Sequence, residues 1–461
     1  MKKLIILSYF SLCTVAFCFA GGLLTNTNQS VHFLRNPARG ASIEIDAAYT
    51  NPAGLIKLPF DGFHFAFTNQ SVAQTRTITS TFAPFAGFGG SQTKVFEGEA
   101  TAPIVPSLQA AYKKGNWVLS GNLSVSGGGG KATFNRGLPS FESIIATAPA
   151  VLNSYLPAIG GYSTDSYMSG SSFIYGAQLG GTYAINEMFS AYAGFRLNIV
   201  NNGYEGYMVN NKIGVNGNLL PADQVIALNP AFASFEPFTS DKVLDCSQSG
   251  WGITPVIGLH FSFQNLNIGT KYEFNSALNV ENKTKENTTG IDDFKNGVNT
   301  PHDIPALFTI GASYTFADAI TVSGGFHQFF DSSAKMSKDK QKHINGGTTE
   351  YLAGAEWKIN KMFLISCGGQ ITRQGITDDY QSDLSFSLNS YSIGFGGAVN
   401  VAPNVRINIG YFVTNYSNWT KHSADYGNIS QLSGGMIPPI QGTDVFSRTN
   451  KVFGAGVDFS F

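Results

Sequence analysis

The sequence contains few charged residues: Asp, Glu, Lys and Arg make up 13% of its 461 residues. A soluble domain typically has about a quarter charged residues, so we expect something other than water to cover much of this surface. The 29 basic and 30 acidic residues give a formal net charge of −1. Because binding to a nucleic-acid backbone needs an excess of positive charge, this balance argues against a nucleic-acid partner.

Long apolar runs are also missing, except at the N-terminus. Two lysines precede an apolar stretch over residues 4–19, and small residues follow at positions 20–22. This pattern predicts a cleaved signal peptide at residues 1–20, and therefore export. A retained membrane helix would need a stop-transfer pattern, and the bulky Phe17 disfavours lipid modification of Cys18. Beyond this stretch no run approaches the roughly 18 apolar residues that a membrane helix needs.

Cysteine is scarce and catalytic motifs are missing. Cys13 and Cys18 belong to the signal peptide; Cys246 and Cys367 are far apart in sequence, so we expect two free thiols, with a disulfide as the alternative. The seven histidines are scattered, without a His-Glu-x-x-His zinc motif or a serine placed by motif for a triad. We therefore expect no enzyme, no catalytic residue, no metal site and no cofactor. A barrel lipase would need such residues brought together in space.

The sequence is rich in glycine and aromatic residues, with 52 Gly, 37 Phe and 19 Tyr, and in segments of period two. Apolar and polar residues alternate over 117–126, 191–199, 307–316, 405–414 and 453–460. A period of two places the two kinds on opposite faces of a strand. Strands that cross a membrane must close on themselves, because lipid offers no partner for unpaired backbone groups. The pattern predicts an all-β fold, a transmembrane antiparallel β-barrel.

The connections alternate between short and long. Short turns are expected near residues 113–115, 185–187, 264–266, 316–319, 359–361 and 402–404. Long connections are expected over residues 83–102, 137–167, 202–250, 281–303, 331–348, 375–383 and 421–448. They join about fourteen strands, an even number as in bacterial single-chain barrels, with the short turns on the periplasmic side and the long loops facing outward.

Residues 21–59 do not resemble a barrel strand, so the barrel itself is expected over residues 60–461. The segment contains Asn36-Pro37-Ala38 and Asn51-Pro52-Ala53. Proline removes a ladder donor and fixes φ, so neither tripeptide suits a central strand. The segment is expected to fold inside the lumen and plug it; a periplasmic tail is the alternative.

The run Ala47-Ala48-Tyr49-Thr50-Asn51-Pro52-Ala53-Gly54-Leu55 resembles the signature of the FadL-type long-chain fatty acid transport proteins of Gram-negative outer membranes. The resemblance implies a fourteen-stranded barrel with an N-terminal hatch, whose motif would be Asn51, Pro52 and Ala53. It transfers no role to the second copy of the tripeptide. It also implies an inward kink in the third strand that opens a lateral gate in the wall.

Four consecutive glycines, Gly127, Gly128, Gly129 and Gly130, lie where the resemblance would put that gate, in a strand expected over residues 116–135. Glycines weaken a ladder and allow a bulge or bend. The alternative is a glycine-rich strand end near the outer rim. The run does not fit a phosphate-binding loop, because no glycine stands at the required upstream position.

Two apolar segments in the long loops are candidates for a substrate groove. Residues at helical spacing form the first, with Ser140 as a possible cap and Pro149 as a bend: Phe141, Ile144, Ile145, Ala148, Val151, Leu152, Tyr155 and Leu156. The second runs over residues 220–228, led by Pro221 in the first helical turn, and is followed by Phe232, Phe235 and Phe238. The alternative is that these faces only pack the loops on each other.

Strand parity places Arg196, Lys271 and Arg406 in the lumen, with Glu273 on the same face as Lys271. These cations are candidates for binding a substrate carboxylate. The alternative is a structural ladder of charges, which is common inside barrels.

Together these features predict an outer-membrane protein that moves hydrophobic molecules, such as long-chain fatty acids or similar lipophilic compounds, by passive diffusion with lateral exit. The expected partners are the substrate, outer-membrane lipids and the barrel-assembly machinery, and we expect a monomer. A general porin for small solutes and a structural or adhesin barrel are the alternatives. Apolar pockets discriminate weakly among molecules of similar size, so the substrate stays open.

Overall fold

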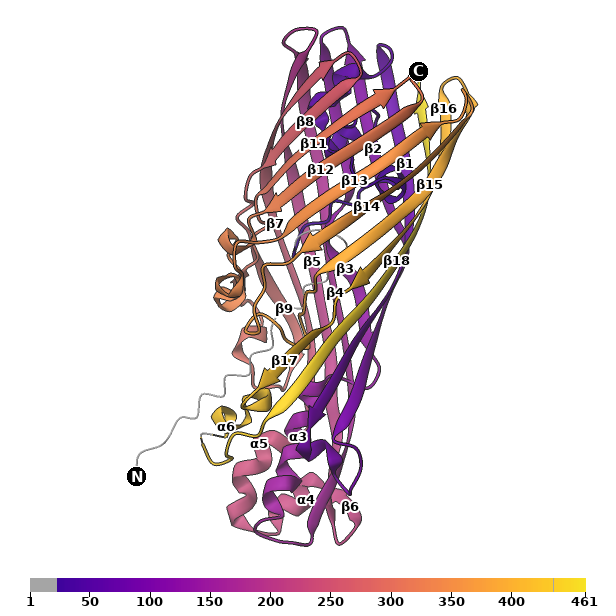
Figure 1. Cartoon of the computed structure of the whole chain (residues 1–461). Coiled ribbons are helices and arrows are strands. Elements are labelled where there is room, and N and C mark those ends of the chain that lie inside the picture. The colour runs from indigo at the N-terminus through magenta and orange to yellow at the C-terminus, as the bar shows by residue number, and fades with distance from the viewer. Residues whose placement is uncertain (1–22, 434) are drawn as a thin grey trace.

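One closed antiparallel sheet forms the body of the molecule (Figure 1). The computed structural model describes residues 23–433 and 435–461; the predicted signal peptide, with Cys13 and Cys18, lies outside them. Fourteen of the described strands form the wall: β1 (Gly62–Phe82), β2 (Thr93–Lys114), β3 (Trp117–Phe134), β4 (Ile159–Ala184), β5 (Phe189–Val215), β7 (Lys242–Phe263), β8 (Leu266–Glu273), β11 (Leu307–Phe316), β12 (Ile320–Phe329), β13 (Thr349–Lys358), β14 (Phe363–Arg373), β15 (Ser390–Ala402), β16 (Val405–Tyr416) and β18 (Gly442–Ser460).

Shorter elements lie at the ends of these strands and inside the wall. Four short strands extend the sheet: β6 (Asn218–Pro221), β9 (Asn279–Asn287), β10 (Asn299–Pro301) and β17 (Trp419–Ser423). The N-terminal segment contains α1 (Val31–Arg35), α2 (Ala47–Thr50) and η1 (Pro52–Lys57). The long loops contain η2 (Ala83–Ala86), α3 (Pro139–Leu152), α4 (Ala222–Ala227), η3 (Pro230–Phe235), α5 (Glu236–Thr239), η4 (Asp292–Phe294), η5 (Asp331–Ser333), η6 (Ser337–His343), η7 (Tyr426–Asn428) and α6 (Ile429–Leu432). Among the described helices, none has the length and apolar character needed to span a bilayer.

The last strand closes the barrel on the first. β18 pairs with β1 without a register shift, from Phe82 opposite Gly442 to His64 opposite Ser460. The Phe63 N–H then donates to the carbonyl of Phe461, at 2.7 Å. The strand predicted from the alternation at the C-terminus is confirmed, and the structure shows that it closes the barrel.

All six predicted short turns join wall strands, and they gather at the end of the barrel that holds the C-terminus (Figure 1). Two of these turns are stabilised in the same way, by an asparagine side chain that accepts backbone hydrogen bonds. The side-chain oxygen of Asn186 accepts from the backbone N–H groups of Met188 and Phe189, and Asn360 does the same for the two residues at its own turn. Such asparagine turns fix a tight reversal without a long loop.

Several of the predicted long loops were too long, because strands occupy parts of them. Strand β2 already starts at Thr93, β4 at Ile159 and β18 at Gly442, and β5 continues to Val215. Residues 281–303 include parts of two short strands, β9 and β10. In these outer parts both faces of the strands are polar or mixed, so the alternation fades from the sequence while the backbone pairing of β4, β5 and β7 continues.

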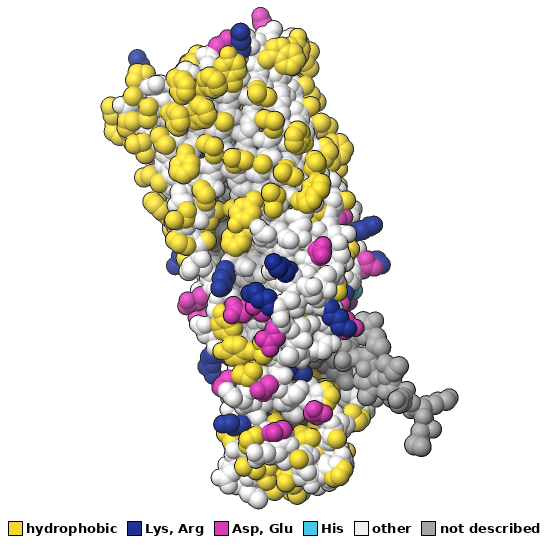
Figure 2. All heavy atoms as spheres, turned by 180° about the vertical axis from the view of Figure 1, so that it is seen from behind, with side chains coloured by type: hydrophobic (Ala, Val, Ile, Leu, Met, Phe, Trp, Pro, Cys, Tyr) yellow, Lys and Arg dark blue, Asp and Glu magenta, His cyan; other side chains and the backbone are white. Residues whose placement is uncertain are grey.

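An apolar belt surrounds the turn end of the barrel (Figure 2). On β3, Leu119 and Leu123 are 56% and 53% exposed, whereas the alternate residues Ser120 and Asn122 are buried. Charged side chains cover the surface beyond the belt, toward the end that carries the long loops (Figure 2). The strand faces predicted by parity are confirmed. The belt includes Phe63, Phe67, Tyr112, Trp117, Leu119, Leu123, Tyr175, Leu179, Phe195, Ile199, Trp251, Ile253, Phe316, Phe395, Ile409 and Phe453.

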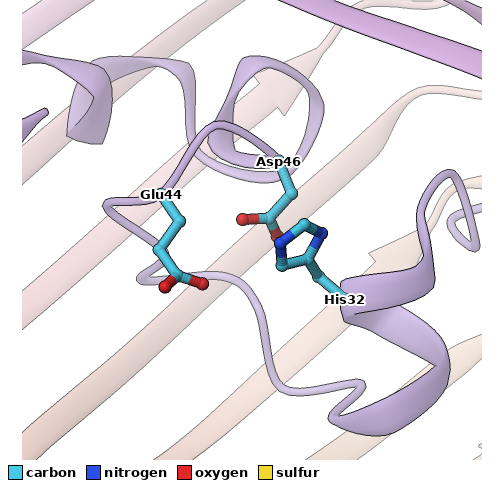
Figure 3. Close-up of side chains that lie close together, drawn as sticks. All are labelled: His32, Glu44 and Asp46. Atoms are coloured by element: carbon cyan, nitrogen blue, oxygen red, sulfur yellow. The ribbon is translucent and has the colours of Figure 1, made fainter. Parts of the chain in front are cut away.

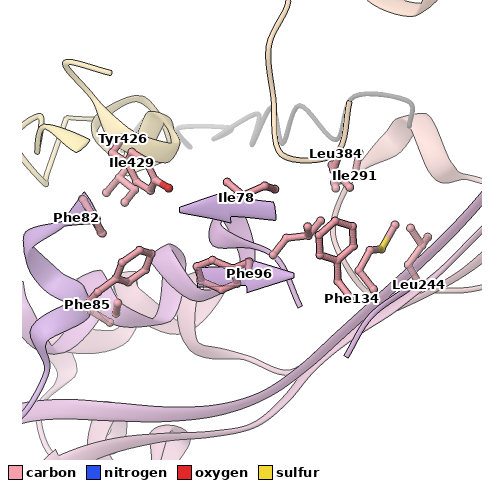
Figure 4. Packing of buried hydrophobic residues seen from close by; sticks show 14 of the residues in the cluster. Ile78, Phe82, Phe85, Phe96, Phe134, Leu244, Ile291, Leu384, Tyr426 and Ile429 are labelled. Carbon is pink, nitrogen blue, oxygen red and sulfur yellow. The ribbon is translucent and has the colours of Figure 1, made fainter. Parts of the chain in front are cut away.

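The opposite end of the barrel is filled by a second group of apolar side chains, here called the outer cluster (Figure 4). Its members come from β1, β2, β3, β4, β5, β7 and β18 and from several long loops, and each is almost completely buried. They include Ile78, Phe82, Phe85, Phe96, Phe134, Leu244, Ile291, Leu384, Tyr426 and Ile429. The long loops therefore pack into a hydrophobic core of their own.

Candidate functional site

Residues 23–59 lie inside the wall and are held there by inward-facing side chains. The Lys271 ammonium donates to the carbonyl of Tyr49 at 2.7 Å, and Gln178 donates to the carbonyl of Ala48 at 3.0 Å. The hydroxyl of Ser190 donates to the carbonyl of Ala53 at 2.7 Å. Strands β4, β5 and β8 thus supply the hydrogen-bond partners that an irregular buried backbone needs.

The Asn-Pro-Ala motif at 51–53 begins the turn of η1. Pro52 occupies the first helical position, where its fixed φ is suited and its missing N–H costs nothing. The Asn51 amide donates to the carbonyl of Ser42 at 2.9 Å and lies 3.0 Å from Nδ1 of His260 on β7. The motif therefore ties the segment both to itself and to the wall.

Glycines on the inner face of the wall let the N-terminal backbone approach closely. A Cβ on Gly394 of β15 would lie 2.1 Å from the carbonyl oxygen of Leu34. A Cβ on Gly269 of β8 would lie 2.2 Å from the carbonyl oxygen of Gly40. Any other residue at these positions would push the segment away from the strand.

A network of ion pairs joins the segment to the strands on the other side of the bore. The Arg39 guanidinium contacts Asp46 at 2.7 and 2.8 Å, Glu44 at 2.8 Å and Glu356 of β13 at 3.3 Å. The predicted ligand residue Arg406, on β16, pairs with the other oxygen of Glu44 at 2.6 Å. These charges are buried or half-buried, and each is paired, as buried charges must be.

His32, Glu44 and Asp46 come close enough to suggest a metal site (Figure 3). Their potential ligand atoms all lie within 4.8 Å of one another. Both carboxylates are already engaged by guanidinium groups, from Arg39 and Arg406. A divalent cation here would face two fixed positive charges at short range, so the residues present do not fit a metal ion.

The predicted ligand residues Arg196 and Lys271 share one carboxylate. Arg196 binds Glu273 through two nitrogens, at 2.7 and 2.9 Å, and Lys271 contacts the same carboxylate at 2.7 Å. The ring of Tyr49 lies against both cations, 4.8 Å from the guanidinium carbon and 4.3 Å from the ammonium. The structure brings these two residues together with the N-terminal segment, whereas Arg406 belongs to the separate network around Glu44. Their role in binding a ligand stays a prediction.

The wall has a break where β3 carries its glycines. The pairing of β2 with β3 stops at Leu108 opposite Leu123 and resumes at Ala100 opposite Ala132. Between these points β3 stays paired with β4, but its register shifts twice, and Gly128 and Gly130 have φ of +79°. Strand β3 continues past the glycines to Phe134. The run is thus a double bulge inside the strand.

The start of the described chain lies against this break. The Asn26 N–H donates to the carbonyl of Ser126 at 2.9 Å, and the Gly128 N–H donates to the carbonyl of Leu24 at 3.3 Å. Thr25 forms an antiparallel bridge with Gly127. Residues 24–26 therefore use hydrogen-bonding groups on the edge of β3 that β2 leaves unpaired.

The outer end contains a small apolar pocket with a cavity volume of about 30 Å³. The predicted residues Phe141 and Ile144 line it, from the confirmed helix α3, whereas Ile145 and Leu152 point into neighbouring packing and are fully buried. Further lining residues come from β4, β5, β7 and the following loop: Met168, Gly206, Tyr207, Met208, Lys242, Leu244, Thr289 and Ile291.

Two details of the predicted loop helices were wrong. Leu138 is the N-cap of α3, and no side chain caps it. Ser140 instead donates its backbone N–H to Asp383, at 2.8 Å, and burial raises the pKa of that carboxyl. Pro221 is the N-cap residue of α4, one position before the first turn. Proline at 139 explains the first difference, because it is itself suited to the first helical position.

Both described cysteines are free: Cys246 is buried and Cys367 is exposed. The expectation of two isolated thiols is confirmed.

No protein-family model matches the chain, and no curated protein matches it. Several solved structures are similar along most of its length, including the three that follow. A FadL homologue of Pseudomonas aeruginosa superposes with a TM-score of 0.67 and 10% identity, over 96% of this chain and 100% of that one. The toluene transporter TodX of P. putida gives a TM-score of 0.55 and 16% identity, over 90% and 94%. The toluene transporter TbuX of Ralstonia pickettii gives 0.53 and 13%, over 92% and 98%.

The fold is that of the FadL-type barrels. The predicted fold class, a closed antiparallel barrel of fourteen strands, is confirmed. At identities of 10–16% the likeness concerns the FadL-type architecture, so the chemistry of the site must come from this chain's own residues.

Sequence reasoning missed two residues at the break in this FadL-type wall. Pro103 and Pro106 lie in the part of β2 that leaves β3 unpaired. Proline has no N–H to donate to a neighbouring strand. A signal was present, because the register that starts at the turn after Lys114 would place Pro103 opposite Gly128 and Pro106 opposite Val125, next to the glycine run. Both edges of the break therefore carry residues that interrupt a ladder.

Proposed function

We propose that this protein moves hydrophobic molecules across an outer membrane, with residues 23–59 as a hatch and the break between β2 and β3 as a lateral exit. The main support for this proposal is the break in the pairing of β2 with β3. Pro103 and Pro106 lie on its β2 edge, the glycine run lies on its β3 edge, and the N-terminal backbone is hydrogen-bonded to β3 there. A general porin for small polar solutes conducts them along its bore and does not need an opening in the wall toward the lipid.

The physical reason for such a route lies in the substrate. Burial of a hydrocarbon chain in an apolar pocket gains about 0.8 kcal/mol per CH₂, so an apolar molecule leaves a dry site most readily into lipid. In the proposed path, the molecule enters the pocket beside α3, passes the outer cluster, reaches the N-terminal segment and leaves sideways at Gly127. No energy source is needed, because the concentration gradient drives the flux.

The apolar belt supports the membrane placement. Aromatic and aliphatic side chains surround the turn end of the barrel, and charged residues begin beyond it (Figure 2). A belt of this kind matches the acyl region of a bilayer. The structures of similar fold include proteins named as toluene transporters, which supports a lipophilic cargo without choosing between aromatic compounds and fatty acids.

Deleting residues 23–59 tests the hatch. Conductance in planar bilayers should be low for the intact chain and rise sharply for the deletion variant. Equal conductance would show that the bore was already open, as in a general porin. Uptake of a radiolabelled alkane and of a fatty acid into cells that express the chain tests the cargo. Uptake of neither, with correct assembly, would contradict the proposal and favour a structural barrel.

A further inference from the structure

The Asn51 side chain of the N-terminal segment reaches across to His260, an inward-facing residue of β7. Its amide nitrogen donates to the carbonyl oxygen of Ser42 at 2.9 Å and lies 3.0 Å from Nδ1 of His260. A carbonyl oxygen only accepts hydrogen bonds, so the atom between these two partners must be the NH₂ group of Asn51. Nδ1 of His260 must then be an acceptor that carries no proton.

The second ring nitrogen of His260 contacts the wall. Nε2 lies 3.2 Å from the side-chain oxygen of Asn267 on β8. Because Nδ1 has no proton, the one proton of a neutral imidazole sits on Nε2 and is donated to this oxygen. The ring is only 1% exposed. Asn51, His260 and Asn267 thus form one hydrogen-bonded relay, here called the latch, which requires a neutral imidazole.

No counter-charge would stabilise a second proton on His260. In the described part of the chain it forms no ion pair, and the charged group that acts on it is the cation Lys57 of η1. The residues opposite it in the sheet, Ser190 of β5 and Gly269 of β8, do not titrate. The titratable side chains on the same face of the adjoining elements are Lys57 of η1, Tyr192 of β5 and Lys271 of β8. None of these carries a negative charge at neutral pH.

A proton on Nδ1 of His260 would break the latch. Two N–H groups would face each other, unless the amide of Asn51 turned its oxygen toward the ring and gave up the bond to Ser42. That oxygen, Oδ1, is buried and has no partner among the described residues, so it is the acceptor available to a protonated ring. Either response removes one of the two hydrogen bonds that position Asn51, and a buried polar group without a partner is costly.

Protons can reach the latch from the turn end of the bore. A polar cavity of about 400 Å³ lies there between the N-terminal segment and the wall. Asn267 and Lys57 line it, together with Asn404 of the short turn at residues 402–404. A polar space of this size is large enough for several water molecules. Asn267 therefore connects His260 with the aqueous side of the short turns.

We propose that His260 is a positioning residue for the hatch, which holds Asn51 only while its ring is neutral and releases the motif in acid. This inference rests on the proposed role of residues 23–59 as a hatch and adds a means of regulating it. The latched state needs the neutral ring, whereas the released ring takes up a proton with the usual imidazole pKa of about 6.5. The latch is therefore fully stable above about pH 6.5 and is lost as the pH falls below it.

Hydrogen exchange of residues 47–58, in the full chain in detergent, measures the release without a transport assay. The reference is His260→Asn, whose side-chain oxygen can take the place of Nδ1 but does not titrate. At equal pH, the ratio of the two exchange rates cancels the intrinsic pH dependence of exchange. The ratio of parent to reference should be about one at pH 7.5 and about tenfold or more at pH 5.

The matched control is His64→Asn, which replaces another buried histidine at the turn end. His64 contacts Ser460 and the carbonyl of Phe60, and not Asn51. This variant should exchange like the parent chain at both pH values. If His260→Asn does not assemble, His260→Gln is a second reference without a titratable ring. A ratio near one at pH 5 would overturn the inference.

The variant Asn51→Ala separates the latch from a merely structural role of His260. Without the amide there is nothing for the ring to hold, so His260→Asn should no longer alter exchange at pH 5 in this background. Residues that act through each other show such a dependence, whereas independent residues have additive effects. The same pH-dependent ratio in both backgrounds would therefore overturn the inference.

Conductance in planar bilayers separates the latch from the hatch itself. With pH 5 on the side of the short turns, the parent chain should open about tenfold more often than at pH 7.5, and His260→Asn should not respond. If exchange responds to acid but the conductance does not, the latch stands and the hatch role of residues 23–59 fails. If exchange does not respond while deletion of residues 23–59 opens the bore, the latch fails and the hatch proposal stands.

Discussion

The carbonyl oxygen of Leu24 occupies the place where a side chain on Gly127 would begin: a Cβ at Gly127 would lie 2.1 Å from it. The N-terminal backbone can pair with the edge of β3 at this point because residue 127 has no side chain. The glycine at position 127 is therefore what allows residues 24–26 to cover the break between β2 and β3.

Gly127→Ala should detach residues 24–26 from β3 and leave the barrel intact. The added methyl group cannot share space with the Leu24 carbonyl, and the N-terminal backbone is the part that can move. We expect faster hydrogen exchange at the Asn26 amide and faster uptake of a hydrophobic probe. Gly181→Ala is the matched control, because its Cβ would meet its nearest neighbour at 4.0 Å. Unchanged hydrogen exchange and unchanged uptake in Gly127→Ala would contradict the claim that residues 24–26 close the break.

Replacing Pro103 and Pro106 by threonine should close the break from the other side. Threonine restores two backbone donors on the edge of β2 and favours strand structure. The variant should assemble normally and take up hydrophobic molecules several-fold more slowly. This change is a better test of the exit than valine at Gly128, since a Cβ there would lie 2.4 Å from the Ser172 carbonyl and would disturb the pairing with β4. Uptake at the parental rate would count against the lateral route.

Lys271→Met separates the two interpretations of Lys271. If the residue anchors the N-terminal segment, the variant should lose about 2 kcal/mol of unfolding free energy, because Tyr49 and Glu273 lose a charged donor. If it binds substrate, ligand affinity should fall with little change in stability. Urea unfolding in detergent and binding assays measure the two. Lys285→Met, which removes an exposed ion pair with Asp245, should change neither.

His302 should make the outer loops sensitive to acid. Burial lowers the pKa of His302 to about 4, and its Nε2 has no partner among the described residues. Because the folded pKa lies below the unfolded value of 6.5, the unfolded chain binds the proton more tightly. Stability is therefore retained above pH 6.5 and lost as the pH falls toward 4, by on the order of 2–3 kcal/mol.

The variant His302→Leu should lack this part of the pH dependence. Urea midpoints at pH 7.5 and pH 4 measure it, compared with His422→Leu, which changes an exposed histidine. If the urea midpoints of the parent chain and of His302→Leu fall by the same amount between pH 7.5 and pH 4, the pKa of His302 is not lowered by folding.

The sequence alone determined the parts of this structure that depend on local periodicity. Leu119 and Leu123 face outward and Ser120 faces inward because a strand has period two, whatever its neighbours are. The short turns followed from the spacing of the alternating segments, and two of them are fixed by Asn186 and Asn360, whose side chains act within three residues. Such signals need no knowledge of the rest of the chain.

The tertiary structure decided which inward side chains meet. Lys271 and Tyr49 are 222 residues apart, and Arg76 faces Arg448 only because the last strand closes on the first. Parity predicted that Lys271 and Arg406 point inward, but their partners depend on the register of the whole closed sheet. The outer strand ends were decided in the same way, because backbone pairing continues there without the contrast between an apolar and a polar face.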